Sequence, residues 1–342
     1  MGKRPTQEQV ARLAETSTAV VSYVVNNGPR PVAENTRKRV LEAIAATGYR
    51  PNSAARTLVS GRSSVIGLVV PDLANPFLAL LAQSIEHELF SRAYSMLIGD
   101  SADEQRREAS VVETLLTHEI SGLIWYTVAQ PPPQDVLDKL TIPTVILNDI
   151  EREDLSAADE AGRVVSVLAD EREAARLATE HLVDHGRQRI AHVGGPSQRL
   201  NSAARARGWL DAVAASDLRP GGQIAAPFTR QGGFESAAQL VELECDAVVA
   251  ANEMQGIGLL AGLRRAGVRV PEDLGVIALN GTTAADYSLP TLTTVEMLTA
   301  DLAAEIADTL DSDSQALTIV PDVRMIARES CGCANIGFGT GR

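Results

Sequence analysis

The sequence predicts an α/β protein in two parts: an N-terminal helix-turn-helix domain with a short hinge helix, and a two-lobe body of doubly wound parallel sheets. Three observations predict this organisation. Helix caps and apolar residues at helical spacing fill the first 50 residues. Strand-like and helix-like segments alternate from Ser64 onward. The net charge changes sign between the two parts, which favours different partners for them.

The two parts of the chain carry net charges of opposite sign. Residues 1–62 hold ten Lys/Arg and four Asp/Glu residues, a net of +6, and the whole 342-residue chain carries −13, which leaves −19 for the remainder. A basic head can neutralise phosphates locally, while an acidic body discourages non-specific docking. A chain of 342 residues is also longer than a single hydrophobic core usually supports, so several domains are expected.

The N-terminus and the apolar runs indicate where the protein works. No apolar run reaches the roughly 18 residues expected of a membrane span. Basic residues begin the chain, but no apolar segment follows them as it would in a signal peptide. We therefore expect a cytoplasmic protein without a membrane partner.

The first predicted helix starts after Thr6. The sequence TQEQ has the form of a capping box, in which the Thr6 hydroxyl accepts a hydrogen bond from an amide three residues later. Val10, Leu13 and Ala14 then supply an apolar face at helical spacing.

A second short helix follows almost at once. Ser17 is a good N-cap for a helix over 18–25, with Val21, Val24 and Val25 turned inward. Two short helices joined by so tight a turn form a helix-turn-helix, whose second helix enters the major groove of DNA.

The third helix completes a small bundle. It is predicted over Glu34–Thr47 with Val40, Leu41 and Ile44 as its apolar stripe, and Gly48 stands where a left-handed cap belongs. Composition alone leaves open a three-helix bundle with no role in DNA binding.

The segment after Arg50 predicts a hinge. Asn52 or Ser53 can cap a helix over 53–58, which is too short to be stable alone. It would form when held by the same segment of a second chain in the minor groove. Leu58 is then an apolar wedge that could enter a base step.

The body reads as two sets of alternating strands and helices. The first set contains the strand-like segments SVIGLVVPDL, YSMLIGDS, SGLIWYTV and IPTVILNDI. The second set is predicted to begin at RVVSVLAD and to continue with RIAHVGG, a strand near 223–226, DAVVAANE and LGVIALNG. Apolar strands alternating with helices imply parallel sheets covered on both faces, and ligands bind such sheets outside the strand carboxyl ends.

Polar and aromatic residues gather at these strand ends. Amides and a guanidinium supply directional hydrogen bonds and aromatic rings supply apolar faces, which suits a small hydroxylated ligand in the cleft between lobes. The candidates are Asp72, Asn75, Phe77, Asn148, Asn201, Arg205, Phe234, Asn252 and Asn280. The alternative is that each of them only caps a helix or shapes a turn.

No catalytic or metal motif is predicted. No nucleophile elbow or Ser/His/Asp order is present, so we expect no enzyme and no cofactor. His181, His185 and His192 lack a carboxylate that would complete a metalloprotease pattern. Cys331 and Cys333 offer only two ligands without a partner cluster, so we expect no metal site.

The sequences QEQVARLAETSTAVVSYVVNN and NTRKRVLEAIAATGYRPNSAARTLVSGRSSVIGLVVPDLANPF resemble the lactose-repressor/galactose-repressor family of bacterial transcription factors. The resemblance extends from Thr6 to about Ser330. It implies a DNA-binding domain at 1–50, a hinge at 51–62, and an effector-binding and dimerisation body of the periplasmic-binding-protein type at 63–342. The lobes would comprise about 63–166 with 297–322, and about 167–296 with 323–342.

The resemblance also implies roles for residues of the head. Thr18, Ala19 and Tyr23 would read bases, Ser17, Ser22 and Asn26 would face phosphates, and Leu58 would be the minor-groove wedge. Thr6, Asn52 and Ala55 complete the expected DNA contacts. The partners implied are a double-stranded, pseudo-palindromic operator, a second copy of the chain in a homodimer, and a small-molecule effector, a sugar or a derivative. Repression released by an inducer is expected, with corepression left open.

Two departures from the family pattern concern the head. Tyr23 stands where the family usually has Arg, and a tyrosine offers one hydroxyl where an arginine makes a bidentate contact to guanine. We therefore expect an unusual operator or weaker binding, unless Tyr23 packs on the bundle and reads nothing. Ala33 replaces the usual Ser cap of the third helix, a loss of typically about 1 kcal/mol.

Other departures concern the cleft. Asn148 and Asn280 stand where a sugar-gripping Asp is common, Gly281 replaces a second Asp, and Met297 replaces a polar residue. Fewer carboxylates mean fewer strong acceptors for sugar hydroxyls, so the ligand could be a less polar or anionic derivative, or not a sugar. The rival functions are a periplasmic sugar receptor, which needs a signal peptide and no basic head, and a cleft-bearing enzyme.

Overall fold

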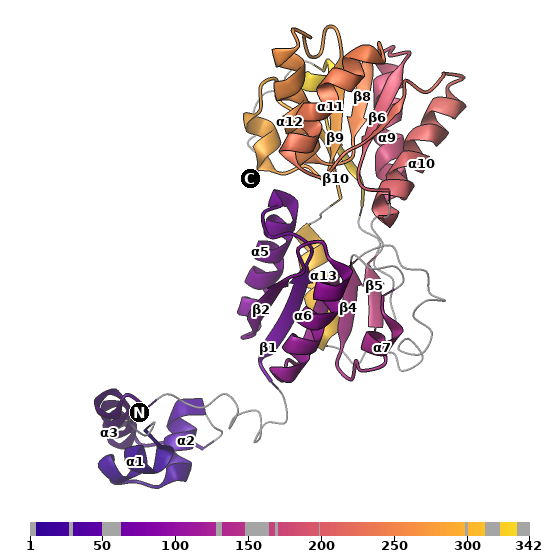
Figure 1. Cartoon of the computed structure of the whole chain (residues 1–342). Helices are drawn as coiled ribbons and strands as arrows, with labels where there is room; N and C mark the ends of the chain where they lie inside the picture. Colours follow the sequence, from indigo (N-terminus) through magenta and orange to yellow (C-terminus); the bar gives the residue numbers. More distant parts are fainter. Residues whose placement is uncertain are drawn as a thin grey trace. The chain divides into compact units, whose positions relative to one another are not determined.

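The computed structural model describes residues 5–26, 30–49, 63–127, 132–147, 164–167, 170–197, 199–297, 300–311 and 322–333. The chain divides into two compact units, Met1–Ser64 and Val65–Arg342 (Figure 1). A search of the described helices finds none with the length and apolar character needed to cross a membrane. Each unit is built from its own apolar core.

The first unit contains the three predicted helices. They are α1 (Gln7–Leu13), α2 (Thr18–Asn26) and α3 (Glu34–Thr47). Their buried faces meet in one small core of Val10, Ala11, Ala14, Val21, Val24, Val40 and Ala43. The helix-turn-helix prediction is confirmed, because two apolar stripes too short to be stable alone are buried against the third helix.

The helix ends follow the predicted caps. Thr6 Oγ1 accepts from the Gln9 amide at 3.4 Å and Gln9 Oε1 accepts from the Thr6 amide at 2.9 Å, a complete capping box. Ser17 Oγ accepts from the Val20 amide at 3.3 Å. Ala33 offers no side-chain cap to α3. Gly48 ends α3 at φ +65°, a conformation that costs glycine little.

Two residues predicted to face the core point outward. Leu13 is 57% exposed and Leu41 is 53% exposed. The buried face of α1 contains Val10 and Ala14, and the buried face of α3 contains Val40 and Ala43. Successive residues of a helix are rotated by about 100°, so a leucine directly beside one of these buried residues in the sequence points away from the core. The expectation that both belong to the core is wrong.

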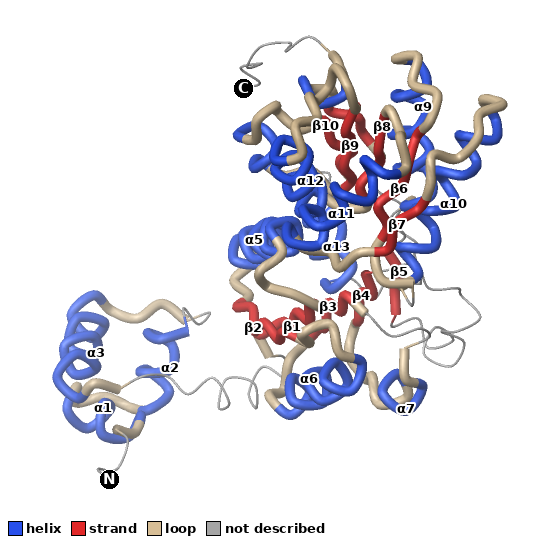
Figure 2. Tube along the Cα trace, turned by 45° about the horizontal axis from the view of Figure 1, so that its top comes forward, coloured by secondary structure: helices blue, strands red, loops and turns tan. Residues whose placement is uncertain are grey.

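The first lobe of the body is a five-stranded parallel sheet with the order β2-β1-β3-β4-β5. Its strands are β1 (Val65–Val70), β2 (Ser95–Asp100), β3 (Gly122–Tyr126), β4 (Thr144–Leu147) and β5 (Val164–Val167). Figure 2 shows α5 (Pro76–Ser91) and α13 (Ala300–Asp311) on one side of this sheet and α6 (Gln105–Thr117) and α7 (Gln134–Leu137) on the other. Both faces are buried, in agreement with the uninterrupted apolar strands.

The second lobe is a six-stranded sheet with the order β11-β10-β9-β8-β6-β7, in which only the edge strand β11 is antiparallel. Its strands are β6 (Ile190–Gly194), β7 (Gln223–Ala225), β8 (Ala247–Ala250), β9 (Gly275–Leu279), β10 (Thr293–Glu296) and β11 (Arg324–Ile326). Helices α9 (Glu171–Asp184) and α10 (Leu200–Ala215) cover one face, and α11 (Arg230–Glu242) and α12 (Glu253–Arg265) cover the other. Two short helices complete the lobe: η2 (Thr283–Tyr287) follows β9 in the chain, and η3 (Glu329–Cys331) packs against β9 and β10.

The grouping of the strands differs from the prediction at one strand. The segment RVVSVLAD, expected to open the second set, forms β5 and pairs with β4 in the first sheet, with Val164 opposite Thr144. The lobe bounds implied by the resemblance, with the first lobe ending near residue 166, already included most of this strand. The late helix α13 packs against α5 of the first lobe, while β11 returns to the second sheet.

His192 is sealed inside the second lobe. It lies in β6, its Nδ1 is 2.9 Å from the Val249 carbonyl oxygen, and its ring stacks on Trp209 at 5.6 Å between centroids. Burial lowers the pKa of His192 to about 4, although the hydrogen bond to Val249 acts in the opposite direction. The imidazole is therefore neutral at pH 7.

We expect this histidine to make the body sensitive to acid. In the unfolded chain it takes up a proton near pH 6.5, and in the folded chain only near pH 4. The neutral, buried imidazole therefore contributes fully to the free energy of unfolding above pH 6.5. As the pH falls toward 4, this free energy decreases by roughly 2–3 kcal/mol. In urea titrations between pH 6.5 and pH 4, the free energy of unfolding of His192→Phe should decrease less than that of the wild type. His118→Gln changes an exposed histidine as a control, and its free energy of unfolding should decrease as much as that of the wild type. Equal slopes for all three proteins would contradict the prediction.

Candidate functional site

The start of α2 presents the side chains expected to read DNA. Thr18 and Ala19 are exposed, and Ser22 and Tyr23 are half-buried on the same helix. Gln7 Nε2 donates to the Thr18 carbonyl oxygen at 3.1 Å, which ties the beginning of α1 to that of α2. The residues expected to read bases therefore lie in a pair of helices whose starts are both capped, by Thr6 and by Ser17.

The remaining expected DNA contacts cannot be placed. Asn26 ends α2, and its side chain is outside the described part of the chain. Asn52, Ala55 and Leu58 lie in residues 50–62, which are also outside the described residues. Their assignment stays a prediction.

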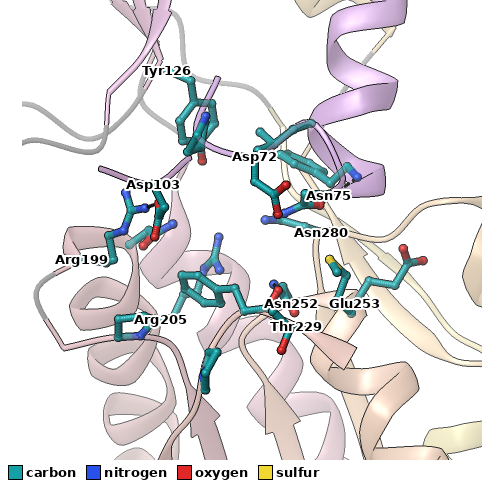
Figure 3. Close-up of a pocket in the computed structure, with 18 residues that line it drawn as sticks. Asp72, Asn75, Asp103, Tyr126, Arg199, Arg205, Thr229, Asn252, Glu253 and Asn280 are labelled. Carbon is teal, nitrogen blue, oxygen red and sulfur yellow. Dashed lines mark hydrogen bonds and ion pairs between the residues drawn. The ribbon is translucent and has the colours of Figure 1, made fainter. Parts of the chain in front are cut away.

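A cavity of about 200 Å³ lies in the body, where the strand carboxyl ends of both sheets converge (Figure 3). The first lobe supplies residues that follow β1 and β2 or end β3: Pro71, Asp72, Asn75, Phe77, Leu78, Asp103 and Tyr126. The second lobe supplies residues that follow β6, β7, β8 and β9: Pro196, Arg199, Asn201, Arg205, Pro227, Phe228, Thr229, Asn252, Glu253, Met254 and Asn280. Each of these strands contributes, as parallel sheets of this type require.

Several of the predicted polar residues use their oxygens to hold the backbone. Asp72 Oδ1 accepts from the Ala74 amide at 2.8 Å, and Asn75 Oδ1 caps α5 through the Phe77 amide at 3.1 Å. Asn252 Oδ1 caps α12 at 2.8 Å, and its Nδ2 donates to the Phe228 carbonyl oxygen at 3.2 Å. Asp72 therefore shapes a turn, and Asn75 and Asn252 cap helices, as the alternative interpretation predicts, and all three also line the cavity.

Two asparagines differ, because their side-chain oxygens are buried and have no hydrogen-bond partner among the described residues. They are Asn201 Oδ1 and Asn280 Oδ1, both on the cavity wall. A buried unpaired acceptor costs free energy, so these oxygens indicate a ligand that donates hydrogen bonds. Asn280 has φ +59°, which asparagine tolerates better than most residues.

Arg205 is locked in place from the second lobe. Its Nε and Nη2 donate to the two carboxylate oxygens of Glu171, both at 2.7 Å, and its Nη1 donates to the Ala251 carbonyl oxygen at 2.6 Å. The ion pair is almost fully buried, with 2% and 5% of the two side chains exposed. Three of the five N–H donors are engaged, which leaves two for a ligand. The guanidinium also faces the Phe228 ring, 5.6 Å from its centroid.

Arg199 and Asp103 form an ion pair between the two lobes. Burial lowers the pKa of Arg199 to about 10, so the guanidinium remains charged at neutral pH, and the facing carboxylate favours that state. Burial also raises the pKa of Tyr126 to about 12, so its phenol stays protonated and can donate to a ligand. The wall thus combines both charges, amides, a phenol and aromatic rings.

The structure brings seven of the nine predicted ligand residues to this cavity, and these are Asp72, Asn75, Phe77, Asn201, Arg205, Asn252 and Asn280. It does not bring Phe234, whose ring is 36% exposed on α11 and lies 5.9 Å from the guanidinium carbon of Arg265. Phe228, which follows β7, takes the aromatic position on the wall. The sequence suggested Phe234 because it lies near a helix start, whereas the strand end itself was the correct signal. Asn148 lies outside the described residues.

Sequence reasoning missed other residues of the wall. Asp103, Tyr126, Arg199 and Thr229 all follow or end a strand, so the same rule could have found them. The sequence predicts a charged helix from Asp103 to Thr117, but α6 begins at Gln105, which leaves the Asp103 carboxylate in the loop before it.

Known proteins resemble both units. The family profile of bacterial regulatory proteins, lacI family, matches residues 6–52, and that of the periplasmic binding protein-like domain matches residues 179–331. Catabolite control protein A of Priestia megaterium is 31% identical over 302 residues, 86% of this chain and 88% of that protein. The ribose operon repressor of Escherichia coli is 29% identical over 314 residues, 89% of this chain and 92% of that protein.

Solved structures extend this resemblance to the whole fold. A complex of the transcriptional regulator CelR with cellobiose has 26% identity and a TM-score of 0.69, over 96% of this chain and all of that one. The lac repressor dimer bound to operator and the anti-inducer ONPF has 23% identity and a TM-score of 0.82, over 96% and 99% of the two chains. The second likeness concerns the fold alone.

Proposed function

Because the chain belongs to the lacI family of bacterial regulatory proteins, whose members bind DNA to regulate transcription, we propose that it is a repressor controlled by a small polar effector. It binds a pseudo-palindromic operator as a dimer, and the effector occupies the cavity between the lobes. The observation that carries this proposal is a cavity walled by both lobes, with two unpaired amide oxygens, in a chain that begins with a helix-turn-helix. A ligand that contacts both lobes can change their angle.

A hydroxylated ligand, a sugar or a derivative, fits the wall best. Asn201 and Asn280 offer acceptors to hydroxyl groups, the free N–H groups of Arg205 offer donors, and Phe77 and Phe228 offer apolar faces. The regulator CelR, similar over nearly all of its length, was solved with cellobiose, which supports a ligand of this class.

Exposed apolar residues on the first lobe support a homodimer. Leu80 and Phe90 on α5 are 38% and 73% exposed, and Leu97 and Ile98 on β2 are 38% and 45% exposed. β2 is an edge strand of its sheet. An apolar edge strand beside an apolar helix face invites association, and a second copy of the chain is the partner that the operator symmetry requires.

The test of DNA binding is selection from random-sequence duplexes with the purified full-length chain. Two half-sites related by pseudo-two-fold symmetry are expected, and binding should weaken steeply with salt. Failure to enrich any sequence at low salt would overturn the repressor proposal. A variant with Tyr23→Arg should enrich a different half-site if this side chain reads bases.

We expect Asn201→Ala to separate ligand binding from stability. The change removes a buried unpaired oxygen, so the free energy of unfolding should stay level or rise by up to about 1 kcal/mol. Ligand affinity should fall by about tenfold, because a hydrogen bond is lost. Metabolites that raise the melting temperature of the wild type identify the ligand, and the variant is then titrated with it. A variant that loses stability but keeps full ligand affinity would contradict the assignment.

A further inference from the structure

Two histidines and two cysteines meet at the far end of α9 from the ligand cavity. His181 and His185 lie one turn apart on α9, so they share a face of that helix. Cys331 ends η3, and Cys333 follows Gly332. One ligand atom from each of the four side chains lies within 4.8 Å of every other. Sequence spacing does not link the two pairs, because about 150 residues separate them.

Three of the nitrogen–sulfur distances in the cluster are close to the edge of a tetrahedron around a metal ion. His181 Nε2 is 3.3 Å from Cys331 Sγ and 3.5 Å from Cys333 Sγ, and His185 Nε2 is 3.2 Å from Cys333 Sγ. A zinc ion with Zn–S of about 2.3 Å and Zn–N of about 2.1 Å places neighbouring N and S ligands about 3.6 Å apart. Contacts among the four side chains hold these three distances within a few tenths of an ångström of that edge.

The backbone at Gly332 directs the Cys331 and Cys333 thiols toward the same two histidines. Gly332 has φ +106°, a conformation that side-chain-bearing residues rarely adopt, and it turns the chain between the two cysteines. Cys331 is buried, Cys333 is half-buried and His185 is exposed. The cluster is therefore anchored at one side and open to solvent at the other, which leaves an entry path for an ion.

We propose that His181, His185, Cys331 and Cys333 form a structural zinc site. Two imidazoles and two thiolates are a soft donor set that favours zinc over magnesium or calcium, and four protein ligands leave no position open for catalysis. Each thiol releases its proton when the Zn–S bond forms, so binding one Zn²⁺ releases two protons without a redox step. The ion clamps the segment after η3 to the C-terminal end of α9.

The test uses the full-length chain purified with a reductant, equilibrated with zinc chloride and freed of unbound ion by gel filtration. Elemental analysis should find one zinc per chain. Cobalt(II) in its place should give the intense d–d bands of tetrahedral geometry and a thiolate-to-metal charge-transfer band. Cys333→Ser and His185→Gln should each lose the tight zinc and the corresponding bands. His185 is exposed, so this second variant has no packing reason to misfold.

Matched controls leave the cluster intact. Cys245→Ser changes the remaining cysteine, which is buried beside the Leu240 carbonyl oxygen, and His118→Gln changes an exposed histidine. Both should keep one zinc per chain. A chelator should lower the melting temperature of the wild type and of both controls, but not that of Cys333→Ser. Three results would overturn the proposal: a wild type that takes up no zinc, equal zinc content in Cys333→Ser, or a Cys331–Cys333 disulfide that persists in reductant.

Discussion

Replacing Arg205 by alanine is expected to lower the free energy of unfolding of the body by about 3–5 kcal/mol. The guanidinium is almost fully buried and makes two hydrogen bonds to Glu171. Its removal leaves the Glu171 carboxylate charged in a low-dielectric interior, without the partner that compensated its lost hydration. Urea unfolding followed by tryptophan fluorescence measures this, because both tryptophans of the chain, Trp125 and Trp209, lie in the body.

Arg172→Ala is the matched control for this prediction. Arg172 lies on α9 next to Glu171 and pairs with Asp211 of α10 at 2.6 Å, so this ion pair joins the same two helices, but 62% and 42% of its two side chains are exposed. Solvent screens an exposed pair of this kind, so its loss should lower the free energy of unfolding far less than the loss of the buried pair. Combining Arg205→Met with Glu171→Leu should recover much of the loss, since it removes both buried charges. If Arg205→Ala cost no more than Arg172→Ala, the buried pair would not have the proposed effect.

Replacing Ile98 by aspartate is expected to separate the proposed dimer into monomers. The residue lies on the edge strand β2, and a carboxylate buried against the apolar face of a second copy loses its hydration without a partner. A central interface position of this kind contributes about 3 kcal/mol, so the dissociation constant should rise by about two orders of magnitude. The affinity for the operator should fall as the dimer dissociates, because a monomer binds only one half-site.

Val241→Asp is the control for the interface. Val241 lies on α11 of the second lobe and is 45% exposed, as is Ile98, so the two changes place the same charge at aliphatic positions of equal exposure. Sedimentation velocity of the three proteins gives the dissociation constants. A dimer that survives Ile98→Asp, or that is weakened equally by both changes, would exclude β2 from the interface.

The local features of the chain were predictable because they depend on neighbours in sequence. The capping box at Thr6 and the left-handed cap at Gly48 formed where the residue types required them. The uninterrupted apolar strands indicated parallel sheets covered on both faces, because a strand buried on both sides carries no polar alternation. The rule that ligands bind at strand carboxyl ends led to seven candidate residues that line the cavity.

The errors have a different origin. Leu13 and Leu41 satisfied helical spacing but lie about one residue off the buried stripe, because a helix of two or three turns fits several stripes and only its packing partner selects one. β5 was assigned to the wrong sheet, because strand pairing depends on a hydrogen-bonded neighbour rather than on the order of segments. Phe234 was predicted to line the cavity because it lies near the start of a helix, but its ring lies beside Arg265, and Phe228, which follows β7, lines the cavity instead.

The sequence by itself determined the helix-turn-helix, the α/β class of the body, the split of charge and the family. The first three follow from caps, periodicity and composition, which act over a few residues, and the family follows from the resemblance of the N-terminal stretches to its members. Only the tertiary structure decided which amide oxygens remain unpaired on the cavity wall, that Arg205 is held by Glu171, and that His181 and His185 face Cys331 and Cys333. Those facts depend on contacts between segments from 34 to about 150 residues apart, and side-chain chemistry specifies such a contact only after the fold has brought the two segments together.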